Sequence, residues 1–275
     1  MINREIAYPY IYVINLERNN DRLENIKSYF ESNQIQYEKF TAVDGKSIIS
    51  SEAQKTINNL RKSKYPGSNH ILSIGEIGCA SSHLELYKKL LASNQEYFII
   101  IEDDVEFDKN FKLFLEQINK LSKIDFDVLF LGYFGSEIND AKNHCRESAI
   151  LKFKGKLKLS NLFTIGIPAH RLWTTMGYIV TRNGAEKMVI LNADLTLLAD
   201  ELTSDSNGFG LKIYAITPPV IFPSSLGFPT ETESNHIIQK RQSVNILKIL
   251  WRKILNSRII IRLKLFCRKF NILFF

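Results

Sequence analysis

The sequence predicts an α/β fold with one mostly parallel central sheet and helices on both of its faces. Short apolar runs rich in β-branched residues recur along the chain, and segments with helical spacing of apolar residues separate them. Acidic or turn-forming residues follow several of the runs, where a strand would end. The chain has 275 residues, which is enough to bury a sizeable core.

The first elements follow from local pattern. "YIYVINL" is nearly all apolar and indicates a buried strand. Leu23, Ile26 and Phe30 then recur at helical spacing after the helix-start residues "NND". The expected order is a strand over 10–16, a helix from about 19, a strand over 37–45 that ends in a turn at Asp44-Gly45, and a helix over 51–63.

A capping box predicts the next helix. Ser73 and Glu76 have the Ser-x-x-Glu spacing in which each side chain bonds the backbone N–H of the other residue. We therefore expect a helix over 74–93. Beyond it we expect a strand over 97–101, a helix over 110–121, a strand over 126–132, an irregular polar segment over 136–160, a strand over 177–181, a helix over 183–193 and a strand over 211–222 that prolines end.

Charge is distributed unevenly between the body and the C-terminal tail. The net charge is +7, but no Asp or Glu follows Glu233, and the residues after it carry ten Lys or Arg. Residues 1–233 therefore have 26 basic and 29 acidic residues. We expect two parts: a globular domain over 1–235 and a basic tail over 236–275.

The tail and the cysteines suggest a location. "NILKILWRKILNS" places apolar residues on one arc and basic residues on the other, a pattern that suits an anionic lipid surface; packing on a protein is the alternative. Three scattered cysteines fit a reducing compartment, and no signal-peptide core or spanning segment is seen. We expect a cytoplasmic protein, peripheral on the inner membrane, and find no nucleic-acid-binding motif.

Three carboxylates, Glu102, Asp103 and Asp104, directly follow the apolar run "YFIII". In open α/β sheets ligands bind at the carboxyl ends of strands, and a divalent cation would offset the mutual repulsion of these acids. Alternation along an extended chain would point Glu102 and Asp104 to one side and Asp103 to the other. The alternative is a solvated acidic turn at a helix start.

Nearby residues suggest an anionic ligand. Arg18 and Arg22 follow the first strand, where guanidinium groups can meet a pyrophosphate or a base, although this motif alone favours two solvated helix arginines. Gly75 and Gly78 lie at the start of a helix, where backbone N–H groups suit an anion. A zinc site of Glu76, Cys79 and His83 on that helix is an alternative that lacks a second ligand cluster; a packed His83 near the ligand is favoured.

Four motifs together resemble glycosyltransferase family 25, which includes bacterial lipooligosaccharide galactosyltransferases. They are "VINLERNNDRL", "AVDG", "SIGEIGCASSH" and "IIIEDDVEF", in this order. The resemblance runs from about residue 10 to 235 and includes a later segment, "WTTMGYIVTRNGAEKM". The resemblance implies a GT-A-type fold, a UDP-sugar donor, most commonly UDP-galactose, and an inverting transfer that forms a β linkage on a glycan acceptor.

The resemblance also implies roles for individual residues. Asp104 and Glu102 would hold Mn²⁺ or Mg²⁺, and Asp103 would support the metal, the ribose or the donor sugar. The remaining nucleotide and donor contacts would come from Asn15, Leu16, Arg18, Arg22, Asp44, Gly45, Gly75, Glu76 and His83. In "LLADELTSD", Asp200 is the first candidate for the general base and Glu201 the second, with solvated acids at a helix start as the alternative.

These expectations combine into two hypotheses of different kinds. One is a metal-dependent transferase that moves a sugar onto a lipooligosaccharide or lipopolysaccharide acceptor at a membrane. The other is a non-catalytic sugar-nucleotide or glycan-binding module, which would bind without turnover. A Mg²⁺-dependent phosphoryl-transfer domain would need a P-loop or a phosphorylatable Asp with a partner Lys, and no Gly-x-x-x-x-Gly-Lys is present.

Overall fold

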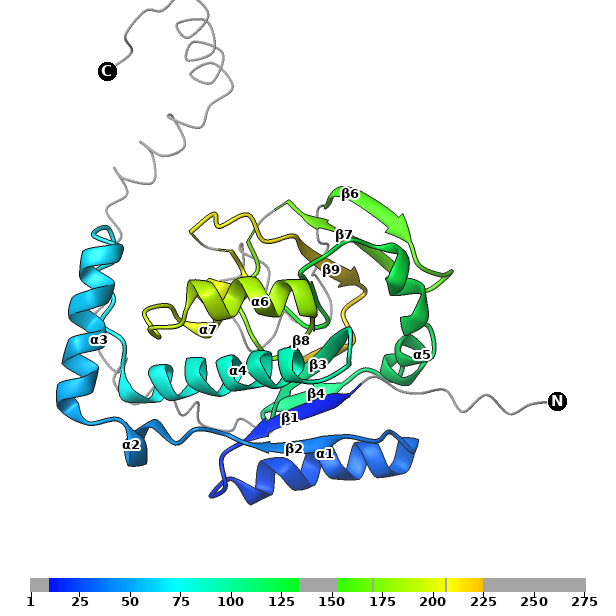
Figure 1. Cartoon of the computed structure of the whole chain (residues 1–275). Helices are drawn as coiled ribbons and strands as arrows, with labels where there is room; N and C mark the ends of the chain where they lie inside the picture. The colour runs from blue at the N-terminus through cyan, green and yellow to red at the C-terminus, as the bar shows by residue number, and fades with distance from the viewer. Residues whose placement is uncertain (1–9, 134–152, 170, 206, 225–275) are drawn as a thin grey trace, which may run out of the picture. The chain divides into compact units, whose positions relative to one another are not determined.

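The computed structural model describes residues 10–133, 153–169, 171–205 and 207–224. These residues form an eight-stranded sheet, a separate two-stranded sheet and the helices that pack against them (Figure 1). The predicted tail over 236–275 lies outside the described residues, as do His170, His236 and all but the first two residues of the non-periodic sequence 223–236.

The first half of the chain follows the predicted order closely. The capping box is present: Glu76 N lies 3.2 Å from Ser73 Oγ, and Ser73 N lies 2.7 Å from Glu76 Oε2. Asp44 does not end a simple turn, because its side chain caps a short helix. The elements are β1 (Ile11–Asn15), α1 (Asn20–Asn33), β2 (Glu38–Thr41), α2 (Gly45–Ile48), α3 (Ser51–Lys64), α4 (Ile74–Ala92) and β3 (Tyr97–Glu102).

The second half departs from prediction in several places. The helix expected over 110–121 is divided into a short α-helix and a 3₁₀ helix, and the strand expected over 211–222 is divided in two at its prolines, which cannot donate to a ladder. The elements are β4 (Val105–Phe107), α5 (Phe111–Leu115), η1 (Ile118–Lys123), β5 (Val128–Phe130), β6 (Phe153–Lys158), β7 (Thr164–Pro168), β8 (Gly177–Thr181), α6 (Arg182–Leu191), α7 (Ala199–Thr203), β9 (Ile213–Thr217) and β10 (Ile221–Pro223).

The hairpin of β6 and β7 at one edge of the large sheet was missed. Five of the six residues of β6 are exposed, among them Lys154, Lys156 and Lys158. Exposed lysines are a common feature of edge strands, because they discourage pairing with another chain. Their polarity conceals the strand, so the irregular segment predicted over 136–160 was wrong for its last residues.

The sheet is mostly parallel by strand direction, as predicted. Its order is β2-β1-β3-β8-β5-β9-β7-β6. β1 is parallel to β2 and β3, and β5 is parallel to β9. β8 is antiparallel to β3 and β5, and β7 is antiparallel to β9 and β6, so only β7 and β8 run against the other six strands.

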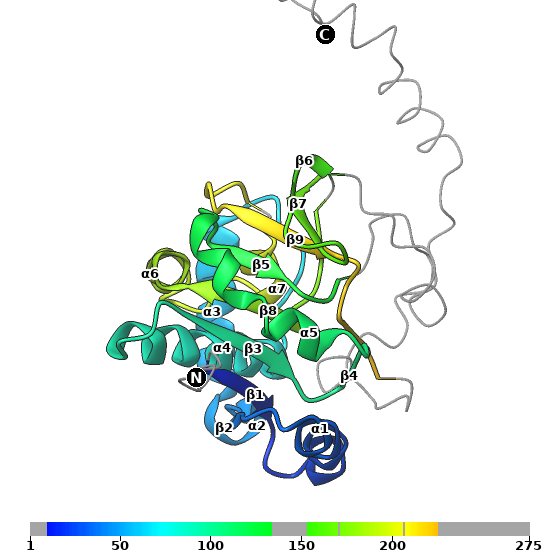
Figure 2. The same ribbon diagram turned by 90° about the vertical axis from the view of Figure 1, so that its right-hand side faces the viewer.

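Helices cover both faces of the sheet. Tyr12 and Ile14 pack in a core cluster with side chains of α4 and α6, whereas Ile11 and Val13 pack in a second cluster with α1 and α5. Figure 2 shows the sheet between these two layers. The predicted α/β class is therefore confirmed, and the two-residue alternation of each strand sorts its side chains between the layers.

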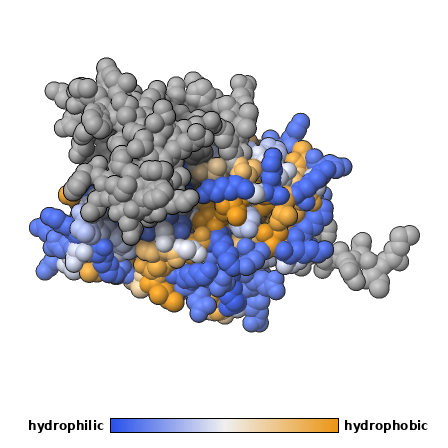
Figure 3. Space-filling model, turned by 90° about the horizontal axis from the view of Figure 1, so that it is seen from above, coloured by the Kyte–Doolittle hydropathy of each residue, from blue (hydrophilic) through white to orange (hydrophobic). Residues whose placement is uncertain are grey.

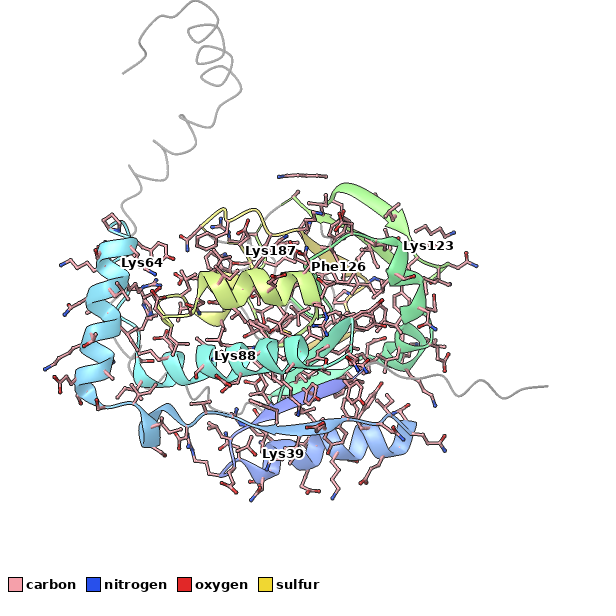
Figure 4. All side chains as sticks on the ribbon, viewed as in Figure 1. Lys39, Lys64, Lys88, Lys123, Phe126 and Lys187 are labelled. Carbon is pink, nitrogen blue, oxygen red and sulfur yellow. The ribbon has the colours of Figure 1, made fainter. Side chains whose placement is uncertain are left out.

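Polar side chains cover the outside of these layers. Lys39 on β2 and Lys88 on α4 are both exposed and project outward (Figure 4). Seen from above, hydrophilic and hydrophobic residues lie side by side on the described surface (Figure 3). No described helix is both long enough and apolar enough to cross a membrane.

Candidate active site

A cavity of about 360 Å³ opens where the carboxyl ends of β1 and β3 meet the first turn of α4 and the start of α7. The parallel register pairs Ile14 with Glu102, so the residues after both strands come together. This is the edge at which α/β sheets bind ligands. The lining residues include Leu16, Arg18, Asn19, Arg22, Val43, Asp44, Gly45, Lys46, Gly75, Glu76, Cys79, Ser82, His83, Glu102, Asp103, Asp104, Trp173, Thr174, Thr175, Leu198, Ala199 and Asp200.

Asp103 is held by residues of the β1–α1 segment. Its Oδ2 lies 2.7 Å from Nδ2 of Asn15, and its Oδ1 lies 3.2 Å from Nη1 of Arg22. All three side chains are buried. Burial raises the pKa of Asp103, although Asn15 and Arg22 act against the shift. Because both carboxylate oxygens have protein partners, Asp103 fits a supporting role better than a direct metal contact.

Asp104 lies on the same cavity as its two acidic neighbours, so the predicted division of these acids between two sides was wrong. Strand β3 ends at Glu102, and the chain turns through Asp103 and Asp104. Alternation stops where the extended backbone stops. As a result Arg22 Nη1, close to Asp103, also lies 3.9 Å from Asp104 Oδ2.

The acidic end of β3 fits a hard divalent cation. Burial and the charges of Glu102 and Asp103 raise the pKa of Asp104 to about 7, and Arg22 only partly offsets them. Among the described residues, the negative charges of Glu102 and Asp103 therefore act on Asp104 more strongly than the positive charge of Arg22 does. Carboxylate oxygens are the ligands that Mg²⁺ and Mn²⁺ prefer. Asp104 and Glu102 are the residues that could hold such an ion.

Glu102 is oriented by a buried network that sequence reasoning missed in part. Its Oε1 accepts a hydrogen bond from Thr175 Oγ1 and faces His83 Nε2 at 3.4 Å. Burial would raise the pKa of Glu102, but the hydrogen bonds of His83 and Thr175 hold it below the usual range. His83 Nδ1 lies 2.7 Å from the Tyr178 hydroxyl, so the favoured packed His83 is what the structure shows.

Ligand atoms of Cys79, His83 and Glu102 lie within 4.8 Å of one another. The zinc alternative named Glu76 with these α4 residues, but the Glu76 carboxylate instead bonds Ser73 N and lies 2.9 Å from His70 Nε2. Burial and nearby carboxylates raise the pKa of the Cys79 thiol well above its usual value, which opposes formation of the thiolate that binds metal. The surroundings of Cys79, His83 and Glu102 therefore favour His83 as a hydrogen-bonding residue and not as a zinc ligand.

The segments that follow β1 and β2, including the first turns of α1 and α2, bring cationic groups to the cavity. Arg18 forms an ion pair with Asp44, whose Oδ1 also accepts a hydrogen bond from Lys46 N at 3.1 Å. Burial would raise the pKa of Asp44, but hydrogen bonds from Ser47 and Lys46 and the Arg18 charge hold it below the usual range. Arg18, Arg22 and Lys46 all line the cavity, as an anionic ligand requires.

The glycines act mainly through packing. A Cβ on Gly45 would lie 2.1 Å from Ile74 O, and one on Gly78 would lie 2.8 Å from both Gly45 N and Val43 O. Gly78 does not line the cavity, so its predicted contact with an anion was wrong; it lets α4 approach the Val43–Gly45 turn. Gly75 does line the cavity, although the capping box already satisfies part of that helix end.

The two candidate bases differ in their surroundings. Asp200 lines the cavity, and burial together with the charges of Glu201 and Glu102 raises its pKa to about 6. Glu201 lies outside the cavity lining, and Arg61 Nη1 and Nη2 bind its two oxygens at 2.8 and 2.7 Å. Its carboxylate also caps Leu198 N at 3.0 Å. The geometry favours Asp200 as a base and gives Glu201 a structural role.

Most of the predicted site residues meet in this cavity. The exceptions are Gly78, Glu201 and Asn15, which supports Asp103 through a hydrogen bond. The residues missed in advance are mainly Trp173, Thr174 and Thr175 before β8 and Lys46 after Asp44. A signal existed for the threonines, since they fall in "WTTMGYIVT", but nothing local says that this segment reaches Glu102.

An α/β domain with carboxylates and cations around one cavity at the carboxyl edge of its sheet has the architecture of an enzyme for a small charged substrate. A sequence model described as "Glycosyltransferase family 25 (LPS biosynthesis protein)" matches residues 8–203. The chain therefore belongs to glycosyltransferase family 25, and the resemblance seen in its motifs is confirmed.

Curated relatives carry related names. The chain is 26% identical over 256 residues to Procollagen galactosyltransferase 2 of Homo sapiens, covering 85% of this chain and 38% of the relative. It is 24% identical to Procollagen galactosyltransferase 1-B of Xenopus laevis, with 84% and 39% covered. It is also 27% identical to Probable inactive glycosyltransferase 25 family member 3 of Bos taurus, with 67% and 29% covered. The chain thus spans well under half of these relatives.

Solved structures overlap only loosely. S. aureus TarS in complex with UDP-GlcNAc has a TM-score of 0.41 at 12% identity, over 91% of this chain and 67% of that one. The inositol-1-phosphate CTP transferase of T. maritima has a TM-score of 0.38 at 10% identity, over 76% and 85%. Overlaps of this size say nothing about the substrate.

Proposed function

We propose that the protein is an inverting, metal-dependent galactosyltransferase that moves galactose from UDP-galactose, in a β linkage, onto a lipooligosaccharide or lipopolysaccharide acceptor. The observation that carries the proposal is the acidic end of β3 beside Arg22 in a cavity that Asp200 also lines. Membership of family 25, the galactosyltransferase names of relatives and the family's description as LPS biosynthesis proteins support it.

The donor would occupy the cationic part of the cavity. Arg18, Arg22 and Lys46 supply positive charge for a nucleotide diphosphate. Asp104 and Glu102 would hold Mn²⁺ or Mg²⁺, with Asp103 fixing Arg22 behind them. When bound, the cation would supply positive charge that stabilises the departing UDP.

Asp200 would act as the general base. An inverting transfer needs a carboxylate that takes the proton of the acceptor hydroxyl as this hydroxyl attacks the anomeric carbon. A carboxyl whose pKa is raised to about 6 is ionised at neutral pH and is a stronger base than an exposed aspartate. Thr175 and His83 keep Glu102 in one orientation, so the acidic end of β3 is organised before a ligand arrives.

The proposed site of action is a membrane surface. A basic tail and a glycolipid acceptor both fit an enzyme that works at the cytoplasmic face of a bacterial inner membrane, where an anionic lipid surface would attract the tail.

A non-catalytic sugar-nucleotide or glycan-binding module is the second candidate. One observation favours it specifically: a bovine relative is named a probable inactive family member. Such a module would bind the same ligands in the same cavity but would release no UDP.

Measuring UDP release separates the two candidates. The purified chain would be incubated with UDP-galactose, UDP-glucose, UDP-N-acetylglucosamine and UDP-N-acetylgalactosamine, with Mn²⁺ or EDTA, and with a lactoside or glucoside acceptor. We expect turnover of UDP-galactose, its loss in EDTA, and a roughly 100- to 1,000-fold decrease in Asp104→Asn. Tight binding of UDP-sugars without release under any condition would favour the binding module, and equal rates with EDTA would remove the metal from the proposal.

A further inference from the structure

The positively charged side chains of the cavity lining come from one part of the sequence. Among the described residues of this lining, every Lys or Arg comes from the first half: Arg18, Arg22 and Lys46. The described lining residues that follow Asp104 are Trp173, Thr174, Thr175, Leu198, Ala199 and Asp200, and none of these six is cationic. A nucleotide diphosphate is drawn to the cations of the first set, whereas the second set offers an indole, small apolar side chains, hydroxyl groups and one carboxylate to a ligand.

Trp173 is the prominent side chain of this second set. It is 42% exposed, although large aromatic side chains usually bury most of their surface. The Arg171 guanidinium lies over its ring, 5.4 Å from the centroid, which helps to fix the orientation of the indole. An indole that lines a cavity and keeps this exposure offers a flat apolar surface to a ligand.

The other lining residues of the second set indicate which chemical groups that ligand should carry. Leu198 and Ala199 add apolar surface, whereas Thr174, Thr175 and Asp200 add hydroxyl and carboxylate oxygens. A pyranose ring matches this combination, because it has an apolar C–H face and a rim of hydroxyl groups. A uracil ring would also stack, but its attached diphosphate belongs beside the cations of the first half.

We infer that Trp173 is the platform on which the acceptor sugar stacks, with the reacting hydroxyl directed to Asp200. The inference rests on the proposed function for the identity of the reaction, but sugar binding at Trp173 can be measured without turnover. The Thr174 hydroxyl and the Asp200 carboxylate would then select among sugars, since a sugar lacking the matching hydroxyl would leave a polar group unpaired.

The first experiment measures binding. The chain has two tryptophans, so a Trp251→Phe variant reports from Trp173 alone. Its fluorescence would be titrated with methyl β-D-galactopyranoside, methyl β-D-glucopyranoside and lactose, and separately with UDP plus Mn²⁺. We expect at least one neutral glycoside to change the emission, and we expect the change to persist when UDP is already bound. A response to UDP alone, with none to any glycoside, would overturn the inference.

The second experiment measures kinetics in Trp173→Ala and Trp173→Phe. We expect the KM for the acceptor to rise roughly 10- to 100-fold in Trp173→Ala and less in Trp173→Phe, with the KM for the donor changed less than about twofold. Ile190→Ala is the matched control, because Ile190 is an exposed apolar side chain on α6 outside the cavity lining. A rise in the KM for the donor instead of the acceptor would show that Trp173 contacts the nucleotide.

The two experiments distinguish the inference from the proposed function. If glycosides bind at Trp173 but no donor releases UDP, the sugar platform stands and the transferase proposal fails. If UDP release occurs and Trp173→Ala leaves the KM for every acceptor unchanged, the transferase stands and the platform fails. Circular dichroism and thermal unfolding of each variant exclude loss of the fold as the cause.

Discussion

The Tyr178 hydroxyl lies 2.7 Å from Nδ1 of His83, and both side chains are fully buried between α4 and the sheet. Tyr178 also lies 2.7 Å from the Tyr87 hydroxyl, and His83 Nε2 faces Glu102. One arrangement of protons satisfies all of these hydrogen bonds. The Tyr87 hydroxyl donates to the Tyr178 hydroxyl, which donates to His83 Nδ1, and His83 Nε2–H donates to the Glu102 carboxylate. The hydrophobic layer thus contains a polar path that orients a site residue.

Tyr178→Phe tests this path. Removing the hydroxyl leaves His83 Nδ1 without its donor, so we expect the free energy of unfolding to fall by about 1–3 kcal/mol. Because Glu102 is then less well oriented, we expect Mn²⁺ affinity to fall roughly 10-fold or more. Urea unfolding and a Mn²⁺ titration measure the two effects.

Tyr29→Phe is the control for that variant. The Tyr29 hydroxyl donates to Asp108 O at 3.1 Å and lies outside the cavity lining, so this change should reduce stability and leave Mn²⁺ affinity as in the wild type. Unchanged Mn²⁺ affinity in Tyr178→Phe would mean that the path only stabilises the fold.

The pH dependence of the reaction follows from Asp200. Its pKa is raised to about 6 by burial and by nearby acids. A base must be ionised to accept a proton, so kcat/KM should fall about tenfold per pH unit below this value and level off above it. We expect Asp200→Asn to lower kcat by roughly 100-fold or more. Asp194→Asn, a carboxylate paired with Lys64 outside the cavity lining, should leave the profile unchanged.

The Arg61–Glu201 pair should matter for stability and not for chemistry. Arg61 is buried and also donates to Thr196 O at 2.6 Å and Ser68 Oγ at 2.8 Å. Arg61→Ala leaves a carboxylate without its partner, and we expect a loss of about 3–5 kcal/mol. Glu201→Gln should retain kcat under conditions where it is folded. A loss of kcat comparable to that of Asp200→Asn would instead restore Glu201 as a base.

Low pH should reduce the contribution of Glu201 to the free energy of unfolding. Burial would raise the pKa of Glu201, but its hydrogen bonds with Arg61 and Leu198 hold it below the unfolded value. The contribution is therefore fully present above the unfolded pKa and is lost as pH falls through the folded pKa. The difference in unfolding free energy between wild type and Glu201→Gln should shrink on acidification, as urea unfolding at several pH values would measure.

Gly78→Ala should disturb the cavity through packing. The added Cβ would meet backbone atoms of Val43 and Gly45, which cannot move as a side chain end can. We expect a loss of about 1–3 kcal/mol and a higher KM for the donor, because the displaced turn carries Asp44. Gly67→Ala is the matched control, since nothing lies within 4 Å of its added Cβ. Equal stability of both variants would contradict the close approach of α4.

Local patterns in the sequence were sufficient for much of the fold. Apolar runs marked β1, β3 and β8, and the Ser73–Glu76 box marked the start of α4, because these signals depend on neighbouring residues only. The exposed edge strand β6 was missed, since its lysines reflect its place at the rim of the sheet. The acids after β3 were identified as a site because polar residues at a strand end are visible in the sequence.

The sequence by itself determined the α/β class, the family resemblance and the acidic strand end, because periodicity and short motifs are properties of contiguous residues. The tertiary structure decided which acids are already engaged. Asn15 reaches Asp103 across 88 residues, His83 reaches Tyr178 across 95, and Arg61 reaches Glu201 across 140. Those contacts depend on the order of strands in the sheet, and spacing along the chain carries no information about that order.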